Sequence, residues 1–326
     1  MRPFTLHQPS TIREALDVLT KHPNARVIAG GTDVLTLLRD AVIRSSQLVD
    51  IAGIGLHGIR HHDDGTTHIG ATTRNNVADR RLRERFPALI QALSSGASPQ
   101  IRNMATFGGN LLQHTRCPYY RQPEFACNRR APGSGCAALH GDRRRSAIFG
   151  ASRTCLAVHP SDLAVALAAL DAIVVVEGKD GIRRIPARGL HRPPGTTPER
   201  PTELHPTDLL TSIELTTSPR ARRSRYVKFR DRASFTFAVA SAAVALDVAE
   251  GVVRSARIVL GGVAPLPWAA SKAEEALVGR TLDDEAISAA SKAATHGVDI
   301  STRNEYKVEL VQRVVHRALS DLGGRS

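Results

Sequence analysis

Residues 10–51 read STIREALDVLTKHPNARVIAGGTDVLTLLRDAVIRSSQLVDI, and this stretch decides the fold at the start of the chain. It opens with a helical pattern over residues 10–21, where a Ser-Thr pair suits the N-cap and apolar residues follow at helical spacing. Two short runs rich in β-branched residues then flank a Gly-Gly-Thr-Asp loop and a second helical run. The strand, helix and strand that these runs predict cover residues 26–29, 34–38 and 47–51. The stretch therefore predicts a compact αβαβ unit.

The rest of the chain predicts a mixed helix and sheet architecture in two parts. In the first part the pattern predicts a hairpin, two helices and a strand, over residues 57–69, 84–97, 163–170 and 173–177. Residues 191–206 contain five prolines and predict a surface connection. The second part predicts strands followed by helices, over residues 225–229, 238–248, 258–262, 270–278, 283–295 and 303–321. Strands first and helices last is the order of an α+β domain.

The charge balance of the chain is strongly basic. Its 326 residues include 44 Lys and Arg against 31 Asp and Glu, a formal charge of +13. Such a charge would suit nucleic acid, but aromatic residues make up only 4% of the chain, so the stacking surfaces that single strands need are scarce. We therefore expect no nucleic-acid binding, and a basic surface that faces a partner protein or an anionic cofactor.

The sequence shows neither a membrane span nor an export signal. No apolar run reaches the ~18 residues that cross a bilayer, and the first residues lack the apolar core of a signal peptide. We therefore expect no membrane span and a cytoplasmic location, unless the folded chain reaches the periplasm by co-export with a signal-bearing partner.

Two glycine pairs have the character of phosphate-binding loops. Gly30 and Gly31 lie between a predicted strand and a predicted helix, where backbone N–H groups are available to an anion. The alternative for this loop is an ordinary turn capped by Thr32 or Asp33. A second pair in residues 106–110, TFGGN, has the same small and polar character. Two such loops favour an extended cofactor that carries phosphate groups.

A third glycine motif is interpreted differently. Residues 53–58, GIGLHG, match G-x-G-x-x-G after a predicted strand. A dinucleotide-binding loop of that kind needs a helix directly after it, and residues 59–65 run into a turn without helical spacing. We therefore predict that this motif does not bind a dinucleotide.

The four cysteines of the chain gather in one irregular stretch of 39 residues, at Cys117, Cys127, Cys136 and Cys155. Two disulfides would need an oxidising compartment. Zinc ribbons pair their ligands a few residues apart, whereas nine, eight and eighteen residues separate these cysteines. An iron–sulfur cube tolerates longer spacing, and the flanking arginines would offset its negative charge. The spacing favours an iron–sulfur cluster, with zinc, disulfides and unliganded thiols as alternatives.

Five segments together resemble the FAD-binding subunits of the xanthine dehydrogenase family of molybdenum hydroxylases, in the order that this family shows. They are VIAGGTDVL (27–35), IRNMATFGGNLL (101–112), HPSDLAVALAALDA (159–172), YVKFRDRASFTFAVASAAVAL (226–246) and GGVAPLPW (261–268). The segment RCPYYRQPEFACNRRAPGSGCAAL (116–139) gives a more specific resemblance. It resembles the four-iron four-sulfur insertion of the FAD subunit of bacterial periplasmic aldehyde oxidoreductase. The flavoprotein subunit of 4-hydroxybenzoyl-CoA reductase also carries a cluster insertion, but with different cysteine spacing.

The resemblance implies an α+β fold in two domains. Residues 1–217 would form a PCMH-type FAD-binding domain of two subdomains, like that of vanillyl-alcohol oxidase. A cysteine-rich 4Fe-4S insertion would occupy about residues 113–157 of this domain. Residues 222–326 would form the α+β flavoprotein C-terminal domain.

The resemblance also implies which residues hold the cofactors. The FAD pyrophosphate would lie on the loop of Arg26, Val27, Ile28, Ala29, Gly30, Gly31, Thr32, Asp33 and Val34. Further FAD contacts would come from Thr106, Gly109, Asn110, Asp162, Leu210 and Lys228. The four cysteines become ligands of the 4Fe-4S cluster, and no residue is assigned as a catalytic acid or base. The alternatives are that Asp162 caps its helix and that Lys228 is a surface cation on an edge strand.

By the same resemblance, the chain would be an FAD and iron–sulfur electron-transfer subunit of a heterotrimeric aldehyde oxidoreductase. A large partner would hold molybdopterin cytosine dinucleotide and bind the aldehyde, and a small partner would hold 2Fe-2S clusters. Electrons would pass from the molybdenum subunit through iron–sulfur clusters to FAD and an external acceptor. The alternatives are a zinc-stabilised nucleic-acid-binding protein, or the FAD subunit of a xanthine, carbon monoxide or hydroxybenzoyl-CoA enzyme.

Overall fold

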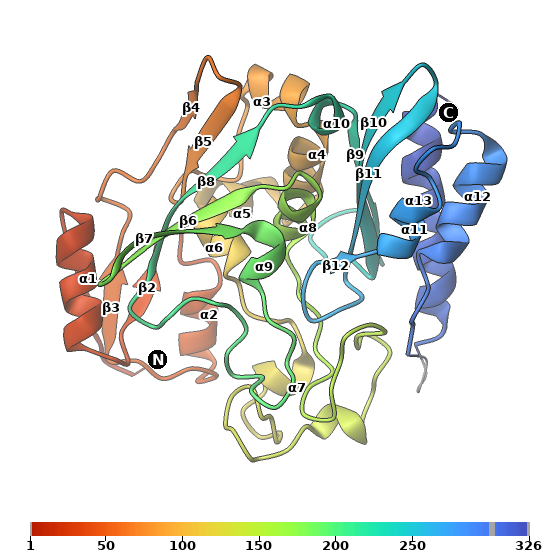
Figure 1. Cartoon of the computed structure of the whole chain (residues 1–326). Helices are drawn as coiled ribbons and strands as arrows, with labels where there is room; N and C mark the ends of the chain where they lie inside the picture. The colour runs from red at the N-terminus through yellow and green to blue at the C-terminus, as the bar shows by residue number, and fades with distance from the viewer. Residues whose placement is uncertain (1, 300–303, 325–326) are drawn as a thin grey trace.

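The computed structural model describes residues 2–299 and 304–324, and these form three sheets with helices packed against them (Figure 1). The N-terminal unit is a small parallel sheet, order β1-β3-β2. Its elements are β1 (Thr5–His7), α1 (Ile12–Lys21), β2 (Arg26–Ile28), α2 (Val34–Arg39) and β3 (Gln47–Asp50). Helix α1 starts after Thr11, whose side chain accepts a hydrogen bond from the backbone N–H of Glu14 at 3.2 Å. The predicted αβαβ unit is confirmed, preceded by one further strand.

The second unit is a five-stranded antiparallel sheet, order β4-β5-β8-β6-β7. Its strands are β4 (Ile59–His61), β5 (Thr66–Gly70), β6 (Ile173–Gly178), β7 (Gly181–Pro186) and β8 (Leu209–Thr216). Its helices are α3 (Arg80–Arg85), α4 (Pro87–Ser95), α5 (Pro99–Met104), α6 (Phe107–Leu111), α8 (Asp162–Ala169) and α9 (Ala187–Leu190). The helix expected over 84–97 is confirmed over Pro87–Ser95, but its start is wrong: Pro87 has no N–H to continue α3, so a new helix begins there.

The C-terminal unit is a four-stranded antiparallel sheet, order β12-β11-β10-β9, with three helices against one face (Figure 1). Its elements are α10 (Pro219–Arg222), β9 (Ser224–Phe229), β10 (Ala240–Ala249), β11 (Val252–Gly261), β12 (Trp268–Ala269), α11 (Ser271–Glu275), α12 (Asp284–Ala293) and α13 (Tyr306–Leu322). The predicted order of strands before helices is confirmed. Residue 303, the expected start of the last helix, lies outside the described residues.

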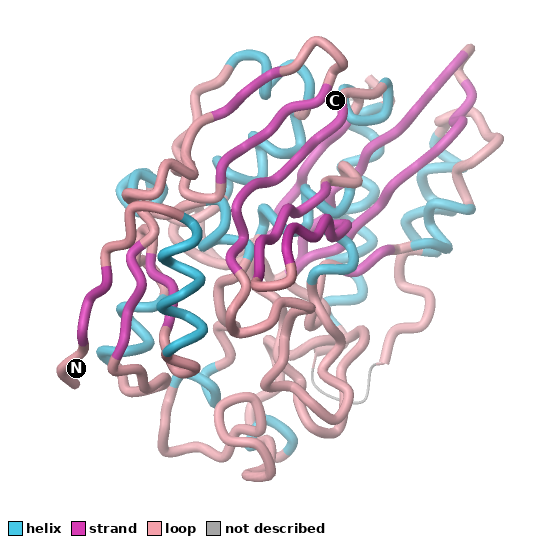
Figure 2. Tube along the Cα trace, turned by 60° about the vertical axis from the view of Figure 1, so that its left-hand side comes forward, coloured by secondary structure: helices cyan, strands magenta, loops and turns pink. Residues whose placement is uncertain are grey.

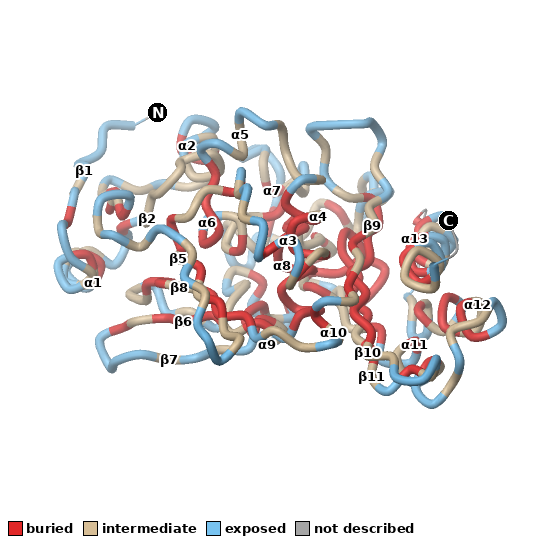
Figure 3. Tube along the Cα trace, turned by 90° about the horizontal axis from the view of Figure 1, so that it is seen from above, coloured by how far each residue is buried: buried red, intermediate tan, exposed pale blue. Residues whose placement is uncertain are grey.

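Helices α4 and α8 join the two larger sheets. Their contact surface is a cluster of mostly small buried side chains: Ala88, Ala92, Val165, Ala166, Ala168, Ala169, Tyr226, Ala243 and Val259. The approach is close, since a Cβ on Gly261 would lie 2.6 Å from Cγ2 of Val165. In Figure 3 the buried chain concentrates around these helices and β10. The N-terminal half and the C-terminal unit therefore pack against each other through this cluster of small buried side chains.

Residues 113–157 form an irregular lobe below the sheets, which Figure 2 shows as mostly loop. Their regular elements within the described residues are α7 (Pro118–Arg121) and a 3₁₀ turn, Ala137–Leu139. Side chains hold the loops together: the guanidinium of Arg130 donates to the carbonyls of Tyr119, Tyr120, Pro123 and Phe125. We call residues 113–157 the cysteine insertion. The expected long irregular loop is confirmed.

Candidate cofactor site and cysteine insertion

The loop between β2 and α2 presents backbone N–H groups without partners. The N–H groups of residues 30–34 donate no hydrogen bond within the described part of the chain. Gly31 has a φ of +70°, which L side chains rarely adopt, and a Cβ on Gly30 would collide with the carbonyl oxygen of Met104. Successive unpaired N–H groups in a turn form a concavity that binds anions. We call residues 29–34 the glycine cradle.

Asp33 ties the glycine cradle to the cysteine insertion. Its carboxylate accepts a hydrogen bond from the backbone N–H of His114 at 2.8 Å and lies 2.8 Å from guanidinium nitrogens of both Arg116 and Arg121. Burial by itself would raise the pKa of Asp33, but these three partners outweigh it and hold the pKa well below the usual range. Asp33, one of the two residues that could cap this turn, occupies the N-cap position of α2, but its side chain makes no capping hydrogen bond.

Most of the predicted FAD residues line one of three cavities. A cavity of about 330 Å³ is lined, among others, by Thr32, Asp33, Gly109, Asn110, Asp162 and Lys228. A cavity of about 770 Å³ is lined by Arg26 and Val27 together with the cysteine insertion, and shares Gln113 and Pro160 with the first. A third, of about 320 Å³, is lined by Ala29 and Thr106. The glycine cradle thus adjoins spaces large enough for the ring systems of a dinucleotide.

Two buried polar atoms in the walls of these cavities have no hydrogen-bond partner among the described residues. Oγ1 of Thr72 and Oδ1 of Asn75 are buried without a hydrogen-bond partner among the described residues, and line the 320 Å³ and 330 Å³ cavities respectively. Buried polar groups in folded proteins are nearly always satisfied. The residues present therefore fit a polar cofactor. Neither residue was predicted as a site residue, because both lie in the connection after β5, where no sequence pattern marks them.

The GIGLHG motif (residues 53–58) lacks the expected helix after it, but its last two residues line a cavity of the candidate site. Strand β4 (Ile59–His61) follows it instead of a helix, so the prediction that it lacks a dinucleotide-binding helix is confirmed. However, His57 and Gly58 line the 320 Å³ cavity beside Ala29 and Thr106. The motif therefore contributes to the wall of the site through its last two residues, without the strand-loop-helix geometry of a Rossmann fold.

Asp162 and Lys228 form a buried ion pair at the far wall of the 330 Å³ cavity. Their side chains are 8% and 3% exposed, and Nζ of Lys228 lies 2.7 Å from Oδ2 of Asp162. The hydroxyl of Tyr226 donates to Oδ1 of Asp162 at 2.5 Å. Both alternatives are wrong: Ser161, not Asp162, is the N-cap of α8, and Lys228 is buried although β9 is an edge strand. The pair joins α8 to the C-terminal sheet.

The remaining predicted FAD residues lie in regular elements around the cradle. Ile28 ends β2 and Val34 begins α2. Leu210 is 3% exposed in β8 and packs into the core that includes Leu111 of α6. An FAD contact of Leu210 would therefore have to come from its backbone, and its role stays a prediction.

A histidine pair lies at the border of the 770 Å³ cavity. The rings of His159 and His191 have centroids 4.1 Å apart, and burial lowers the pKa of both, that of His191 to about 4. Nε2 of His191 contacts the carbonyl of Leu111 at 3.1 Å, while Nδ1 of His191 and Nε2 of His159 are buried without partners among the described residues. This pair was not predicted, because no sequence pattern links two histidines that lie 32 residues apart in the chain.

The four cysteines come together without forming a disulfide. Cys127 and Cys155 are buried, and Cys117 and Cys136 are half-buried. Burial, with a smaller contribution from the neighbouring thiols Cys155 and Cys127, raises the pKa of Cys117 to about 11. The pKa of Cys136 is raised by the same causes. The disulfide alternative is therefore not the arrangement of this structure, and Cys127 and Cys155 lie within electrostatic reach of both Cys117 and Cys136.

Short turns position these thiols. Cys127 and Cys136 face each other across an antiparallel bridge, and Cys155 closes a turn with Ser152. The side-chain amide of Asn128 links the two turns by donating to the carbonyl of Thr154 at 3.1 Å. Over residues 2–299 and 304–324, no group of three or more His, Cys, Asp and Glu side chains lies close enough to hold a single metal ion.

Comparisons with known proteins identify the family. The model described as "FAD binding domain in molybdopterin dehydrogenase" matches residues 2–217, and that described as "CO dehydrogenase flavoprotein C-terminal domain" matches residues 225–322. The chain is 39% identical over 324 residues to the aldehyde oxidoreductase FAD-binding subunit PaoB of Escherichia coli (strain K12), covering 98% of each chain. It is 26% identical over 333 residues to the xanthine dehydrogenase FAD-binding subunit of Escherichia coli O157:H7, covering 98% of this chain and 97% of the relative.

A solved structure agrees with these relatives. Carbon monoxide dehydrogenase from Hydrogenophaga pseudoflava matches with a TM-score of 0.77 and 27% identity, covering 99% of this chain and 98% of that chain. Among the described residues, no helix combines the length and apolar character that a membrane span requires. The fold predicted from the resemblance is confirmed, and this chain belongs to the FAD-binding oxidoreductase subunits of the molybdenum hydroxylase family.

Proposed function

We propose that this chain is the FAD and iron–sulfur electron-transfer subunit of a heterotrimeric, molybdenum-dependent aldehyde oxidoreductase. Its identity to an aldehyde oxidoreductase FAD-binding subunit is 39%, against 26–27% for xanthine dehydrogenase and carbon monoxide dehydrogenase relatives. The observation that carries the proposal is the gathering of four free thiols in one insertion, directly beside the glycine cradle.

The FAD site in this proposal runs from the glycine cradle into the cavities on either side. Unpaired N–H groups of residues 30–34 would bind the pyrophosphate, and Thr106, Gly109 and Asn110 would flank it. The buried Asp162–Lys228 pair would fix one end of the site. When bound, FAD supplies the exchange between one-electron and two-electron transfer. The protein's part is to orient the cofactor and set its electrostatic surroundings, so no residue acts as a catalytic acid or base.

The 4Fe-4S cluster in this proposal takes Cys117, Cys127, Cys136 and Cys155 as its ligands. Burial and the neighbouring thiols raise the pKa values of Cys117 and Cys136, so these two are poor thiolates on their own, and a metal centre would stabilise their deprotonated form. Backbone N–H groups near the sulfurs support that form, since Tyr119 and Tyr120 lower the pKa of Cys117 by hydrogen bonding. These donors are of the kind that tunes cluster potentials.

The proposed partners are a large subunit with molybdopterin cytosine dinucleotide, which would bind the aldehyde, and a small subunit with 2Fe-2S clusters. The relatives named as medium chains of carbon monoxide dehydrogenase support a multi-subunit assembly. The formal charge of +13 supports docking to acidic partners. For location we propose the cytoplasm, or the periplasm by co-export with a signal-bearing partner.

The cluster is tested by metal analysis of the chain, prepared without oxygen together with any subunits that accompany it. We expect Cys127→Ser to remove about four iron and four sulfide per chain relative to the wild type, while FAD stays bound. The matched control is Ser134→Ala. This substitution removes the hydroxyl that accepts a hydrogen bond from the backbone N–H of Cys127, and it keeps all four thiols. Equal iron in Cys127→Ser and wild type, or zinc in place of iron, would contradict the cluster.

The assignment to an aldehyde enzyme is tested on the co-purified assembly. We expect two further subunits and turnover of aldehydes, with no turnover of xanthine or carbon monoxide.

Replacement of both Asp162 by Asn and Lys228 by Met should lower the FAD content of the assembly. A stable chain that binds FAD and accepts electrons without partners would contradict the subunit role.

A further inference from the structure

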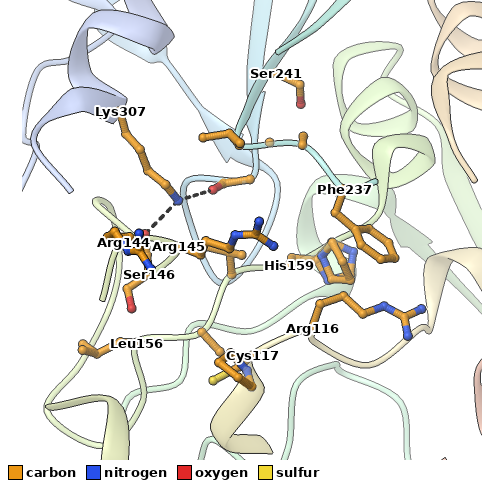
Figure 4. Close-up of a pocket in the computed structure, with 18 of the residues that line it drawn as sticks. Arg116, Cys117, Arg144, Arg145, Ser146, Leu156, His159, Phe237, Ser241 and Lys307 are labelled. Atoms are coloured by element: carbon orange, nitrogen blue, oxygen red, sulfur yellow. Dashed lines mark hydrogen bonds between the residues drawn. The ribbon is translucent and has the colours of Figure 1, made fainter. Parts of the chain in front are cut away.

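A cavity of about 420 Å³ lies where the cysteine insertion meets the C-terminal unit (Figure 4). Most of its wall is apolar, formed by Leu156, Val158, Val165, Phe237, Ala238 and Val239 among others. It adjoins the 330 Å³ cofactor cavity, with which it shares Arg116, Pro160, Asp162 and Phe237. No residue of the glycine cradle lines it. The cavity therefore adjoins the proposed FAD site at Asp162 and extends away from the glycine cradle.

Lys307 is the unusual side chain in this cavity. It is 1% exposed, and its Nζ donates to the carbonyl oxygens of Ser146 and Gly262, each at 2.9 Å. No carboxylate among the described residues lies within ion-pair distance of Lys307, and one of its three N–H groups has no partner there. Burial, aided by the nearby Arg145, lowers its pKa to about 7. A buried ammonium without a counter-ion is costly, so an anion in this cavity would be stabilised.

The other cations around the cavity already have carboxylate partners. Arg116 pairs with Asp33 at 2.8 Å. Arg144 and Arg145 pair with Asp142 and Asp231, each at 2.7 Å. The charge of Lys307 is thus the one that the described residues leave unbalanced in this cavity.

His159 adds a second unsatisfied group to the same cavity. Its Nε2 is buried without a hydrogen-bond partner among the described residues. In Figure 4, Lys307 enters from one side, Leu156 and Cys117 lie on the opposite side, and His159 and Phe237 lie at one end. A neutral imidazole with its proton on Nε2 offers a donor to an oxygen acceptor. An ammonium, a second donor and an apolar wall thus surround one space.

We propose that this cavity binds a small carboxylate with an apolar body. The carboxylate would pair with the ammonium of Lys307, His159 would donate to it, and Phe237 and Leu156 would cover the body. A ligand of this class fits because small-molecule sites combine a mostly apolar lining with a few convergent polar groups. The inference rests on the cavity alone and does not depend on the proposed electron-transfer role.

The test is calorimetric titration of the full chain, purified with any subunits that accompany it, using benzoate as the probe. We expect saturable binding of benzoate that Lys307→Met weakens at least tenfold and that Lys292→Met leaves unchanged. Lys292 is the matched control because it is exposed in the last turn of α12 and receives the same substitution. Benzamide, which has the same shape without the charge, and acetate, which lacks the apolar body, should each bind at least tenfold more weakly than benzoate.

A second variant keeps the test decisive if Lys307→Met fails to fold. Leu156→Trp adds volume to the wall opposite Lys307 and leaves the ammonium in place, so it should also weaken benzoate at least tenfold. FAD and iron contents, measured on the same samples, separate this site from the proposed function. Absence of saturable binding to the wild type, or equal affinity in Lys307→Met or Leu156→Trp and wild type, would overturn the proposal.

Discussion

The glycine cradle and the cysteine insertion meet at Asp33, yet they are built in opposite ways. The cradle is shaped by backbone: a positive φ at Gly31, a close approach at Gly30 and a row of N–H groups without partners. The insertion is shaped by side chains that reach backbone carbonyls, above all the guanidinium of Arg130. The shape of the cradle thus depends on positions where a side chain larger than that of glycine would collide. The shape of the insertion depends on particular polar side chains.

The largest effect is expected where the cradle and the insertion meet. Asp33→Asn removes the charge that Arg116 and Arg121 share, and leaves two guanidinium groups partly buried without an anion. Breaking a buried ion pair on one side costs about 3–5 kcal/mol, and we expect a loss of that order in the free energy of unfolding, measured by denaturant titration. The control is Asp40→Asn, because the Arg39–Asp40 pair is exposed; we expect no measurable change there. An Asp33→Asn chain as stable as wild type would show that the cradle and the insertion are independent.

A smaller effect is expected from the cradle alone. In Gly30→Ala the new methyl group meets the carbonyl oxygen of Met104, so the cradle must shift. We expect about 1–3 kcal/mol of destabilisation and a lower ratio of FAD to protein, read from thermal unfolding and flavin absorbance. Gly53→Ala is the matched control, since nothing lies within 4 Å of its added Cβ. Retention of full FAD binding in Gly30→Ala would mean that the N–H row is not the binding surface.

The insertion is probed by Arg130→Gln. The substitution removes hydrogen bonds to carbonyls of residues 119–125, and we expect a loss of about 1–2 kcal/mol that is confined to the insertion. Hydrogen exchange should speed up in residues 113–157 and stay unchanged in β10. Uniform acceleration over the whole chain would argue against a locally held lobe.

The smallest expected effect is that of mild acid. The pKa of Asp33 is lower in the folded chain than its ordinary value of 3.8, so its stabilisation is complete above that value and declines as pH falls below it. The difference in unfolding free energy between wild type and Asp33→Asn should therefore stay constant from pH 7 to about pH 5 and narrow below about pH 4. A difference that stays constant down to about pH 3 would mean that Asp33 has the same pKa in the folded and the unfolded chain.

The same contrast explains what could be predicted from sequence. The cradle and its flanking strand and helix follow from apolar spacing and a Gly-Gly pair, so β2 and α2 were predicted within one residue of their bounds. The α3–α4 break was missed because helical spacing continues across Pro87, and only the missing N–H ends the first helix.

The polar contacts of the site were harder to predict from the sequence. Arg116 and Arg121 meet Asp33 across more than 80 residues of chain, which no local pattern reports. Thr72 and Asn75 reach the cavities from a connection whose course is set by packing. For Asp162 and Lys228 the resemblance named the residues, but their pairing with each other required the three-dimensional arrangement of α8 and β9.

One feature of the insertion bears on how the chain becomes native. After the last turns of the lobe, Ile148 and Phe149 pack into the core of the C-terminal unit, where Phe149 stacks on Trp268 at 5.1 Å between ring centroids. A nascent chain that has emerged only to residue 217 lacks the surface that receives them, so the lobe stays unfinished until synthesis is nearly complete. The cysteine-bearing loops would therefore stay open during most of translation and close only when the C-terminal unit has been made and has folded.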